Sequence, residues 1–313
     1  MSQEPKPSVA LAPTRSQALD APGKKADLSV TALYTAGTWA WAGVPGAELL
    51  DHEDSRRVFG VVNGALALGA LFRRRPVSLK HSLVQRHAMI DRLVDDAAPA
   101  HVLELAAGLS PRGVHRSADP AVTYTEVDLP PVLARKRSLL GRSSAGAAAL
   151  ARPNLRLVDG DLASVDLAAV SPAPAGAPLT VVAEGLLVYL DAEAQRALFR
   201  RVRALLDGGG LFVFDLVPAP ERARPGLAGR ALGWLMRRFT RGGDFVRDQR
   251  GRRDLVADLA AAGFTVAAIE PAAAPARWQV PHLDRRTEQL VFAAWVPSGK
   301  RTFVADDVAA ASR

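Results

Sequence analysis

The spacing of apolar residues along the chain changes near residue 98. Before that point, apolar residues recur at helical intervals. The clearest stripe contains Leu79, Leu83, Ile90 and Leu93. Arg86 lies on the same stripe, where its guanidinium must either extend to water or meet an anion. We therefore predict a set of helices over residues 28–98.

The most apolar stretch of this helical part is VFGVVNGALALGALF, residues 58–72. It contains Asn63 and several glycines, and it is shorter than the roughly 20 residues that a membrane-spanning helix needs. An arginine run, residues 73–75, follows it. We expect a buried helix here and no membrane contact.

After residue 98, short apolar runs alternate with helical stretches. Strands are predicted at residues 101–106, 122–128, 154–162, 179–185, 211–218, 264–271 and 288–296. Helices are predicted at residues 130–140, 191–210 and 244–262. This alternation predicts an α/β fold with a parallel sheet that has helices on both faces. No helix separates the last two strands, so we expect them to pair as an antiparallel edge.

The remaining segments differ in composition from these elements. The Pro-rich start has no apolar run, so we expect a disordered tail and no secretory signal. The expected division is a tail over 1–27, a helical cap over 28–98, a ligand-binding domain over 99–297 with an Arg- and Gly-rich insertion over 219–243, and a tail over 298–313. The insertion is expected to contribute to a substrate pocket.

Composition and charge exclude several classes of chemistry. The 313 residues include no cysteine, which rules out disulfides, thiolate metal sites, iron–sulfur clusters and a cysteine nucleophile. The net charge is +8, but the arginines are scattered along the whole chain. Scattered cations indicate compositional bias and not a nucleic-acid-binding stripe. We expect a cytoplasmic protein, and the sequence does not indicate its oligomeric state.

Acidic residues follow the first four predicted strands in turn. They are Glu104, Asp128, Asp161 and Glu184. Because ligands of open parallel sheets bind beyond the carboxyl ends of the strands, these acids mark a candidate site. Asp128 lies twenty residues after Gly108, the spacing at which an acid binds ribose hydroxyls in nucleotide-binding units.

Each of these residues also has an ordinary structural interpretation. Glu104 could pair with a nearby arginine, Asp128 could cap the following helix, and Asp161 could be a turn former. Arg86 could belong to an ordinary ion pair or could bind an anion. Only for Glu184 does nothing nearby in the sequence explain a carboxyl beside a buried valine run, which favours a site.

The turn after the first strand restricts the choice of ligand. A dinucleotide requires the three-glycine turn G-x-G-x-x-G, whereas Gly108 is the only glycine of that pattern here. S-adenosylmethionine carries no phosphate, but it has ribose hydroxyls, an adenine amine, an ammonium group and a carboxylate. The strand-end acids, with one arginine for the carboxylate, match these groups.

Side chains that could serve as a base or a metal ligand are scattered. His81, His87, His282 and Tyr189 are possible bases, but a packing or surface role is favoured for each. No histidines have the spacing of a metal site, so no metal is expected. The catalytic residues therefore stay unknown at this point.

Several motifs resemble the leucine carboxyl methyltransferase family, and within it the bacterial polyketide-type O-methyltransferases. They are QRHAMIDRLV, VLELAAGLSPRG, TEVDLP, DGDL and AEGLLVYL, in that order. The resemblance covers residues 29–296 and implies a class I methyltransferase fold. In this fold a seven-stranded, mostly parallel, Rossmann-like sheet ends in an antiparallel strand, and a helical cap precedes it.

The resemblance also implies roles for individual residues. Arg86 would bind the methionine carboxylate, Asp128 the ribose, Asp161 the adenine amine and Glu184 the methionine end. Gly108 would let the methionine part approach the first turn. The expected cofactor set is completed by Glu104, Ala106 and Leu162. Ala106 stands where many methyltransferases have glycine, so a tighter approach is expected there.

The predicted function is an S-adenosylmethionine-dependent O-methyltransferase that acts on a carboxyl or hydroxyl group of a small organic molecule, such as a polyketide-like metabolite. The alternatives are a nucleic-acid methyltransferase, which the charge suggests, a nicotinamide-dependent oxidoreductase on a similar sheet, and a non-catalytic protein that keeps the donor site but lacks an acceptor. Glu184-Gly185-Leu186 replaces the Asn/Asp-Pro-Pro-aromatic turn of base-methylating enzymes, and the missing glycines disfavour a nicotinamide cofactor.

Overall fold

The computed structural model describes residues 30–70, 77–218, 221 and 250–296. The two expected tails lie outside the described residues. So does the expected insertion over 219–243, apart from Glu221.

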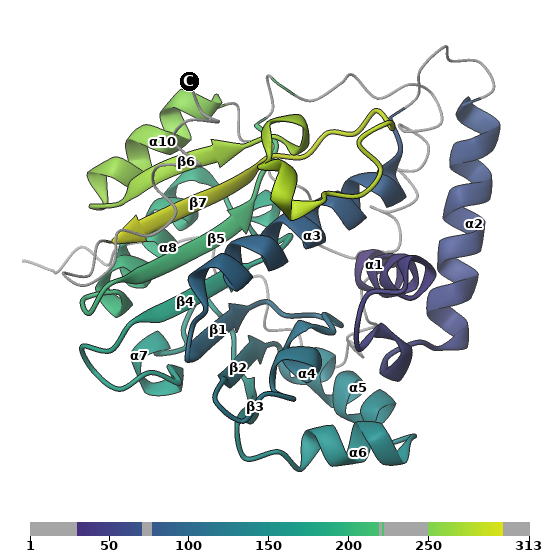
Figure 1. Cartoon of the computed structure of the whole chain (residues 1–313), viewed down its shortest axis with the longest axis horizontal. Coiled ribbons are helices and arrows are strands. Elements are labelled where there is room, and N and C mark those ends of the chain that lie inside the picture. Colours follow the sequence, from purple (N-terminus) through teal and green to yellow (C-terminus); the bar gives the residue numbers. More distant parts are fainter. Residues whose placement is uncertain (1–29, 71–76, 219–220, 222–249, 297–313) are drawn as a thin grey trace, which may run out of the picture.

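The described residues form a seven-stranded sheet with the order β3-β2-β1-β4-β5-β7-β6 (Figure 1). Its strands are β1 (His101–Leu105), β2 (Thr123–Asp128), β3 (Leu155–Asp159), β4 (Leu179–Ala183), β5 (Gly210–Asp215), β6 (Thr265–Ile269) and β7 (Val291–Val296). Strands β1 to β5 pair in parallel, and β7 is antiparallel to both of its neighbours. The predicted α/β sheet with an antiparallel last strand is confirmed. Because β7 inserts between β5 and β6, the edge strand on this side of the sheet is β6, and β3 forms the opposite edge.

The described α-helices surround the sheet, and all but the first two lie close to it (Figure 1). They are α1 (Val30–Ala42), α2 (Glu53–Ala70), α3 (Leu79–Ala97), α4 (Arg112–Arg116), α5 (Pro130–Leu140), α6 (Ser144–Leu150), α7 (Leu167–Val170), α8 (Ala192–Leu205) and α10 (Arg252–Ala261). Alternate residues of β5 face opposite cores, as the two-residue period of a strand requires. Val213 packs with residues of α3, whereas Phe212 and Phe214 pack with residues of α8.

Helix α3 is part of the sheet packing. It contacts β4, β5 and β7, and it crosses one face of the sheet in Figure 1. Most of its apolar stripe lies in the core, since Leu83, Ile90 and Leu93 are buried, whereas Leu79 at the start of the helix is 37% exposed. Arg86 lies on that stripe near the carboxyl ends of the strands, which explains how a guanidinium comes to be buried there.

Helices α1 and α2 stand away from the sheet and pack mainly on each other (Figure 1). The expected buried helix over 58–72 is wrong in part, because α2 leaves Val61 69% and Leu68 67% exposed. Its packing face is narrow, since Val62 is its one fully buried apolar residue among those described. None of the helices in the described ranges is both long enough and apolar enough to span a bilayer.

Some predicted boundaries shift by a few residues. Strand β4 ends at Ala183, which places Glu184 in the following loop. Asp191 caps α8 as predicted, because its side chain accepts from the Ala194 N–H at 2.8 Å. Helix α8 ends at Leu205, before the glycines expected to stop it, and Gly210 already belongs to β5.

An aromatic contact joins β7 to β5, and its contribution to stability can be measured. The rings of Phe214 and Phe292 stack with centroids 4.9 Å apart, and both residues are fully buried. Replacing Phe292 by Ala should lower the free energy of unfolding by about 3–5 kcal/mol, measured by urea denaturation. Phe292→Leu should cost less, because it leaves a smaller cavity. A loss below about 1 kcal/mol for the Ala variant would contradict this packing.

Candidate functional site

A cavity of about 840 Å³ opens at the carboxyl ends of β1, β2 and β3 and extends along α8. Four residues predicted to bind the cofactor line it: Ala106, Asp128, Asp161 and Leu162. Apart from its acids, Ser164 and Arg201, the cavity is lined by alanine, glycine, valine and leucine. A concave, mostly apolar site with a few polar groups is typical of small-molecule binding.

Asp128 fixes the turn that follows β1. Its Oδ2 accepts from the N–H of Gly108 at 2.6 Å, and its Oδ1 accepts from the N–H of Leu129 at 2.7 Å. Burial raises the pKa of Asp128, and these two N–H groups oppose that rise. Leu129, and not Asp128, occupies the cap position of α5, so the helix-capping interpretation is wrong.

The backbone of this turn is left-handed at two positions. Gly108 has φ +56°, and Ala106 has φ +53°. A left-handed conformation is unfavourable for alanine, which explains why a glycine is common at such a position. The Ala106 N–H donates to the Val127 carbonyl at 2.8 Å, and this bond holds the turn against β2.

Asp161 has the geometry of a turn former and also lies at the cavity, so both interpretations of this residue agree with its position. Its Oδ1 accepts from the Ala163 N–H at 2.9 Å, which is the bond of a turn-forming aspartate. The residue is nevertheless exposed to the cavity described above.

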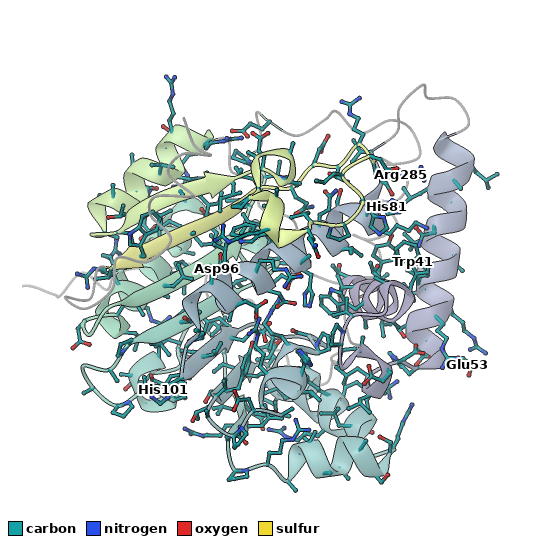
Figure 2. All side chains as sticks on the ribbon, viewed as in Figure 1. Trp41, Glu53, His81, Asp96, His101 and Arg285 are labelled. Carbon is teal, nitrogen blue, oxygen red and sulfur yellow. The ribbon has the colours of Figure 1, made fainter. Side chains whose placement is uncertain are left out.

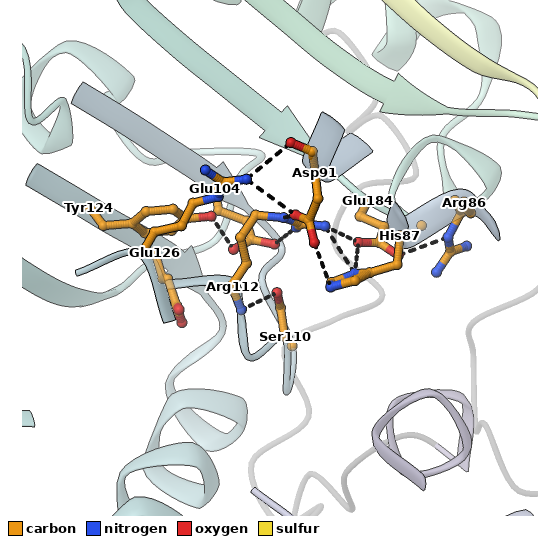
Figure 3. A network of polar contacts seen from close by, with 12 residues as sticks. Arg86, His87, Asp91, Glu104, Ser110, Arg112, Tyr124, Glu126 and Glu184 are labelled. Atoms are coloured by element: carbon orange, nitrogen blue, oxygen red, sulfur yellow. Dashed lines mark hydrogen bonds and ion pairs between the residues drawn. The ribbon is translucent and has the colours of Figure 1, made fainter. Parts of the chain in front are cut away.

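Three other predicted residues, Arg86, Glu104 and Glu184, lie outside that cavity lining in a buried ion-pair network (Figure 3). The Nε of Arg86 donates to Glu184 Oε1 at 2.9 Å, and its Nη1 donates to Asp215 Oδ2 at 3.1 Å. Asp215 ends β5, and its Oδ1 accepts from the Gly185 N–H at 2.6 Å. Arg86 therefore joins α3 to the ends of two adjacent strands.

Arg112 is the centre of the network, and the sequence did not single it out. Its Nε donates to Asp91 Oδ1 at 2.5 Å, its Nη1 to Glu104 Oε1 at 2.7 Å, and its Nη2 to Glu184 Oε2 at 2.8 Å. The other oxygen of Glu104 accepts from the Tyr124 hydroxyl at 2.7 Å. Glu104 thus has the arginine partner that was its alternative interpretation.

His87 also belongs to this network. Its Nδ1 lies 2.9 Å from Glu184 Oε2, and its Nε2 lies 3.3 Å from Asp91 Oδ2. Its ring packs against Trp39 of α1, with centroids 5.1 Å apart. The favoured packing role therefore describes only part of what this residue does, because both of its nitrogens face carboxylates.

The other two candidate histidines lie apart from the strand ends. His81 and His282 meet edge to face at 4.6 Å, and Trp41 contacts both rings. Figure 2 shows His81 and Trp41 between α3 and the α1–α2 pair. Burial lowers the pKa of His81, and the nearby His282 and Lys80 act in the same direction. The cluster packs α1 against α3.

The network holds more carboxylates than buried cations. Asp91, Glu104, Glu184 and Asp215 share two buried guanidinium groups and His87, and Arg116 reaches Asp91 only at 3.7 Å. Burial alone would raise the pKa of Glu184, but His87, Arg86 and Arg112 together hold it well below its usual range. Because the network as a whole has more carboxylates than guanidinium groups, it is suited to a cationic ligand.

The residues present fit S-adenosylmethionine at both ends. Asp128 and Asp161 line a cavity large enough for a nucleoside. At the other end, the Nη2 of Arg86 donates to none of the described residues, which leaves it available to a carboxylate. Gly185 has φ +71°, and a Cβ there would lie 3.5 Å from Arg86 Nη1, so the glycine keeps this side of the guanidinium open. The described residues include no group of three or more His, Asp or Glu that could hold a metal.

A second buried ion pair lies beneath the turn. Lys136 of α5 donates to Glu126 Oε2 and, at 2.5 Å, to the Ser110 carbonyl. Glu126 Oε1 has no hydrogen-bond partner among the described residues. Glu126 is the direct cross-strand neighbour of Glu104. Burial raises the pKa of Glu126 to about 7, although Lys136 opposes the rise.

This raised pKa predicts a pH dependence of stability. Between the unfolded value of 4.5 and about 7, the folded chain retains a proton that the unfolded chain has released. The stability from this group is therefore complete below pH 4.5 and is lost as the pH rises through 7. Glu126→Gln removes this loss.

From pH 5 to pH 8, the unfolding free energy of the native chain should fall relative to that of the variant by on the order of 3 kcal/mol, measured by urea denaturation. The exposed Glu53→Gln is the matched control and should leave the pH profile unchanged. Parallel profiles for the native chain and the Glu126 variant would show that this carboxyl does not titrate in the window.

Comparison with known proteins identifies the family of the chain. A model of the leucine carboxyl methyltransferase family matches residues 47–203, half of the chain. Among curated proteins, a proposed S-adenosyl-L-methionine-dependent methyltransferase of Mycolicibacterium paratuberculosis is 32% identical over 208 residues, and one of Mycobacterium marinum is 33% identical over 142 residues. The first match covers 63% of each chain, and the second covers 44% of each. The chain thus matches less than two thirds of the length of these relatives.

Solved structures show the same fold. A proposed methyltransferase of Thermobifida fusca aligns with a TM-score of 0.52 at 18% identity, covering 86% of this chain and 94% of that one. At this identity the likeness concerns the fold alone, and the predicted class I methyltransferase fold is confirmed.

Proposed function

The chain belongs to the leucine carboxyl methyltransferase family, and on that premise we propose that it is an S-adenosylmethionine-dependent O-methyltransferase. The observation that carries the proposal is the position of Asp128 at the end of β2, where it lines the cavity and holds the N–H of Gly108. This acid, glycine turn and cavity together form a nucleoside site without the glycines that a dinucleotide requires.

The nucleoside end is assigned to the residues that line the cavity. Asp128 accepts the ribose hydroxyls, because its carboxylate is fixed by two backbone N–H groups and still borders the cavity. Asp161 accepts from the adenine amine, and Leu162 and Ala106 contact the nucleoside.

The methionine end is assigned to the ion-pair network. Arg86 binds the carboxylate through Nη2, and Glu184 binds the ammonium group. Glu104 acts only indirectly, because it lies within β1 with its side chain 1% exposed and held by Arg112 and Tyr124, whereas Glu184 lies in the loop beyond β4. Gly108 is assigned to the passage between the two ends, because a Cβ there would meet no atom within 4 Å and the turn therefore leaves space for the ligand.

When bound, S-adenosylmethionine supplies an activated methyl group on a sulfonium, and the protein aligns it with an acceptor. The chain contributes orientation at both ends of the donor and excludes water from the buried network. A carboxyl acceptor is ionised at neutral pH and needs no base. We assign the acceptor to small organic molecules, place α1 and α2 as a cap over the site, and expect a cytoplasmic enzyme.

The role of Asp128 can be tested by its removal. Asp128→Ala should weaken the binding of S-adenosylhomocysteine about tenfold or more, because charged hydrogen bonds to the ribose are lost. Isothermal titration calorimetry on the full chain measures this change. Unaltered affinity would argue against the nucleoside assignment.

Asp159 provides a matched control. It is the register partner of Asp128 on β3, but it pairs with Arg137 at 2.9 Å and does not line the cavity. Asp159→Ala should leave the affinity within about twofold of the native value.

The acceptor class needs a separate measurement. Incubating the enzyme with methyl-labelled S-adenosylmethionine and panels of carboxylic acids, phenols and amines should label the acids or phenols. An ester product would release its label as methanol in mild base, whereas a phenol ether would retain it. Label on amines alone would contradict O-methylation.

A further inference from the structure

The most heavily paired cation of the network has no direct route to a ligand. The side chain of Arg112 is 1% exposed, and its three nitrogens are taken by Asp91, Glu104 and Glu184. Whatever this residue contributes to binding must therefore pass through one of its partners.

Of these partners, Glu184 is the one that the proposed function assigns to the donor, in the loop that follows β4. Its Oε1 accepts from Arg86, which lies beside the open face at Gly185, and its Oε2 accepts from Arg112. The carboxylate is therefore held from two sides, by a helix that precedes β1 and by a helix that follows it. Without Arg112, only Arg86 and His87 would position it.

The geometry also explains why the cation must be arginine. The three carboxylates come from α3, from β1 and from the loop after β4, and each pairs with a different nitrogen of one planar group. A lysine offers a single charged point on a flexible stem, so it cannot hold three separate carboxylates at once.

We infer that Arg112 is a positioning residue for the amino-acid end of the donor, acting through Glu184. The inference rests on the proposed function, because it assumes that Glu184 receives the ammonium group of the donor. Arg112 fixes the Glu184 carboxylate in one orientation and links it to the turn that holds the nucleoside. Its loss should weaken ligands that carry the amino-acid end and spare ligands that lack it.

Two thioether nucleosides separate this role from a general structural one. S-adenosylhomocysteine carries the amino-acid end, whereas 5′-methylthioadenosine ends at the thioether. Arg112→Lys should weaken the binding of S-adenosylhomocysteine about tenfold and leave 5′-methylthioadenosine within about twofold, measured by titration calorimetry on the full chain. An equal loss for both ligands, or no loss for either, would overturn the inference.

Arg116 supplies the matched control on the same helix. It donates to the Asp91 carbonyl and to Asp95, but it does not touch Glu184. Arg116→Lys should leave the affinities of both nucleosides unchanged.

A double-mutant cycle tests whether the effect passes through Glu184. In the background of Glu184→Gln, Arg112→Lys should weaken S-adenosylhomocysteine by no more than about twofold further. A full tenfold loss in that background would show that Arg112 acts by another route.

If Arg112→Lys does not fold, Asp91→Asn takes its place. Asp91 is 29% exposed and holds the Nε of Arg112, so its amide variant loosens the guanidinium while preserving a hydrogen-bond acceptor. The same selective loss is expected, and equal effects on both nucleosides would again overturn the inference. If the native chain binds neither nucleoside, the proposed function itself fails, which is a different result from a native chain that binds both.

Discussion

Several carboxylates are buried together at the carboxyl ends of adjacent parallel strands, and the rest of the structure depends on how they are neutralised. Because β1, β4 and β5 are adjacent parallel strands, the acids at their carboxyl ends lie close together. A buried charge is tolerated only where it is paired and hydrogen-bonded. Two guanidinium groups, from α3 and α4, satisfy this requirement and in doing so fix both helices against the strand ends.

The two ends of the site are built on different physical principles. Around Asp128 and Asp161 the backbone is the partner, since N–H groups of the turns occupy part of each carboxylate and leave the rest facing an open cavity. Around Glu184 the partners are side chains, namely two guanidinium groups and the His87 ring. The orientation of Glu184 is therefore set by residues of α3 and α4, whereas that of Asp128 is set by the backbone of the adjoining turns.

Features that depend on residues close together in the chain could be predicted from the sequence. The seven strands were found from their short apolar runs, with ends that differ by up to three residues at β3 and β5, and the twenty-residue interval from Gly108 to Asp128 corresponds to a hydrogen bond at 2.6 Å. Arg86 was found because a charge stands out on an apolar helical stripe. The exposure of α2 was missed, because its long apolar run gave no indication that, among the described elements, mainly α1 would cover it.

The network around Glu184 could not have been read from the sequence, because its partners lie far apart in the chain. Glu184 is 97 residues from His87 and 72 from Arg112. Because Glu184 has no partner nearby in the sequence, it was correctly singled out as unusual. For the same reason, nothing in the sequence indicated which cations would pair with it. Arg112 gave one available signal, since it is the first residue of α4 and follows the glycine turn directly. An arginine placed there points back beneath the strand ends, where a parallel sheet collects its acids.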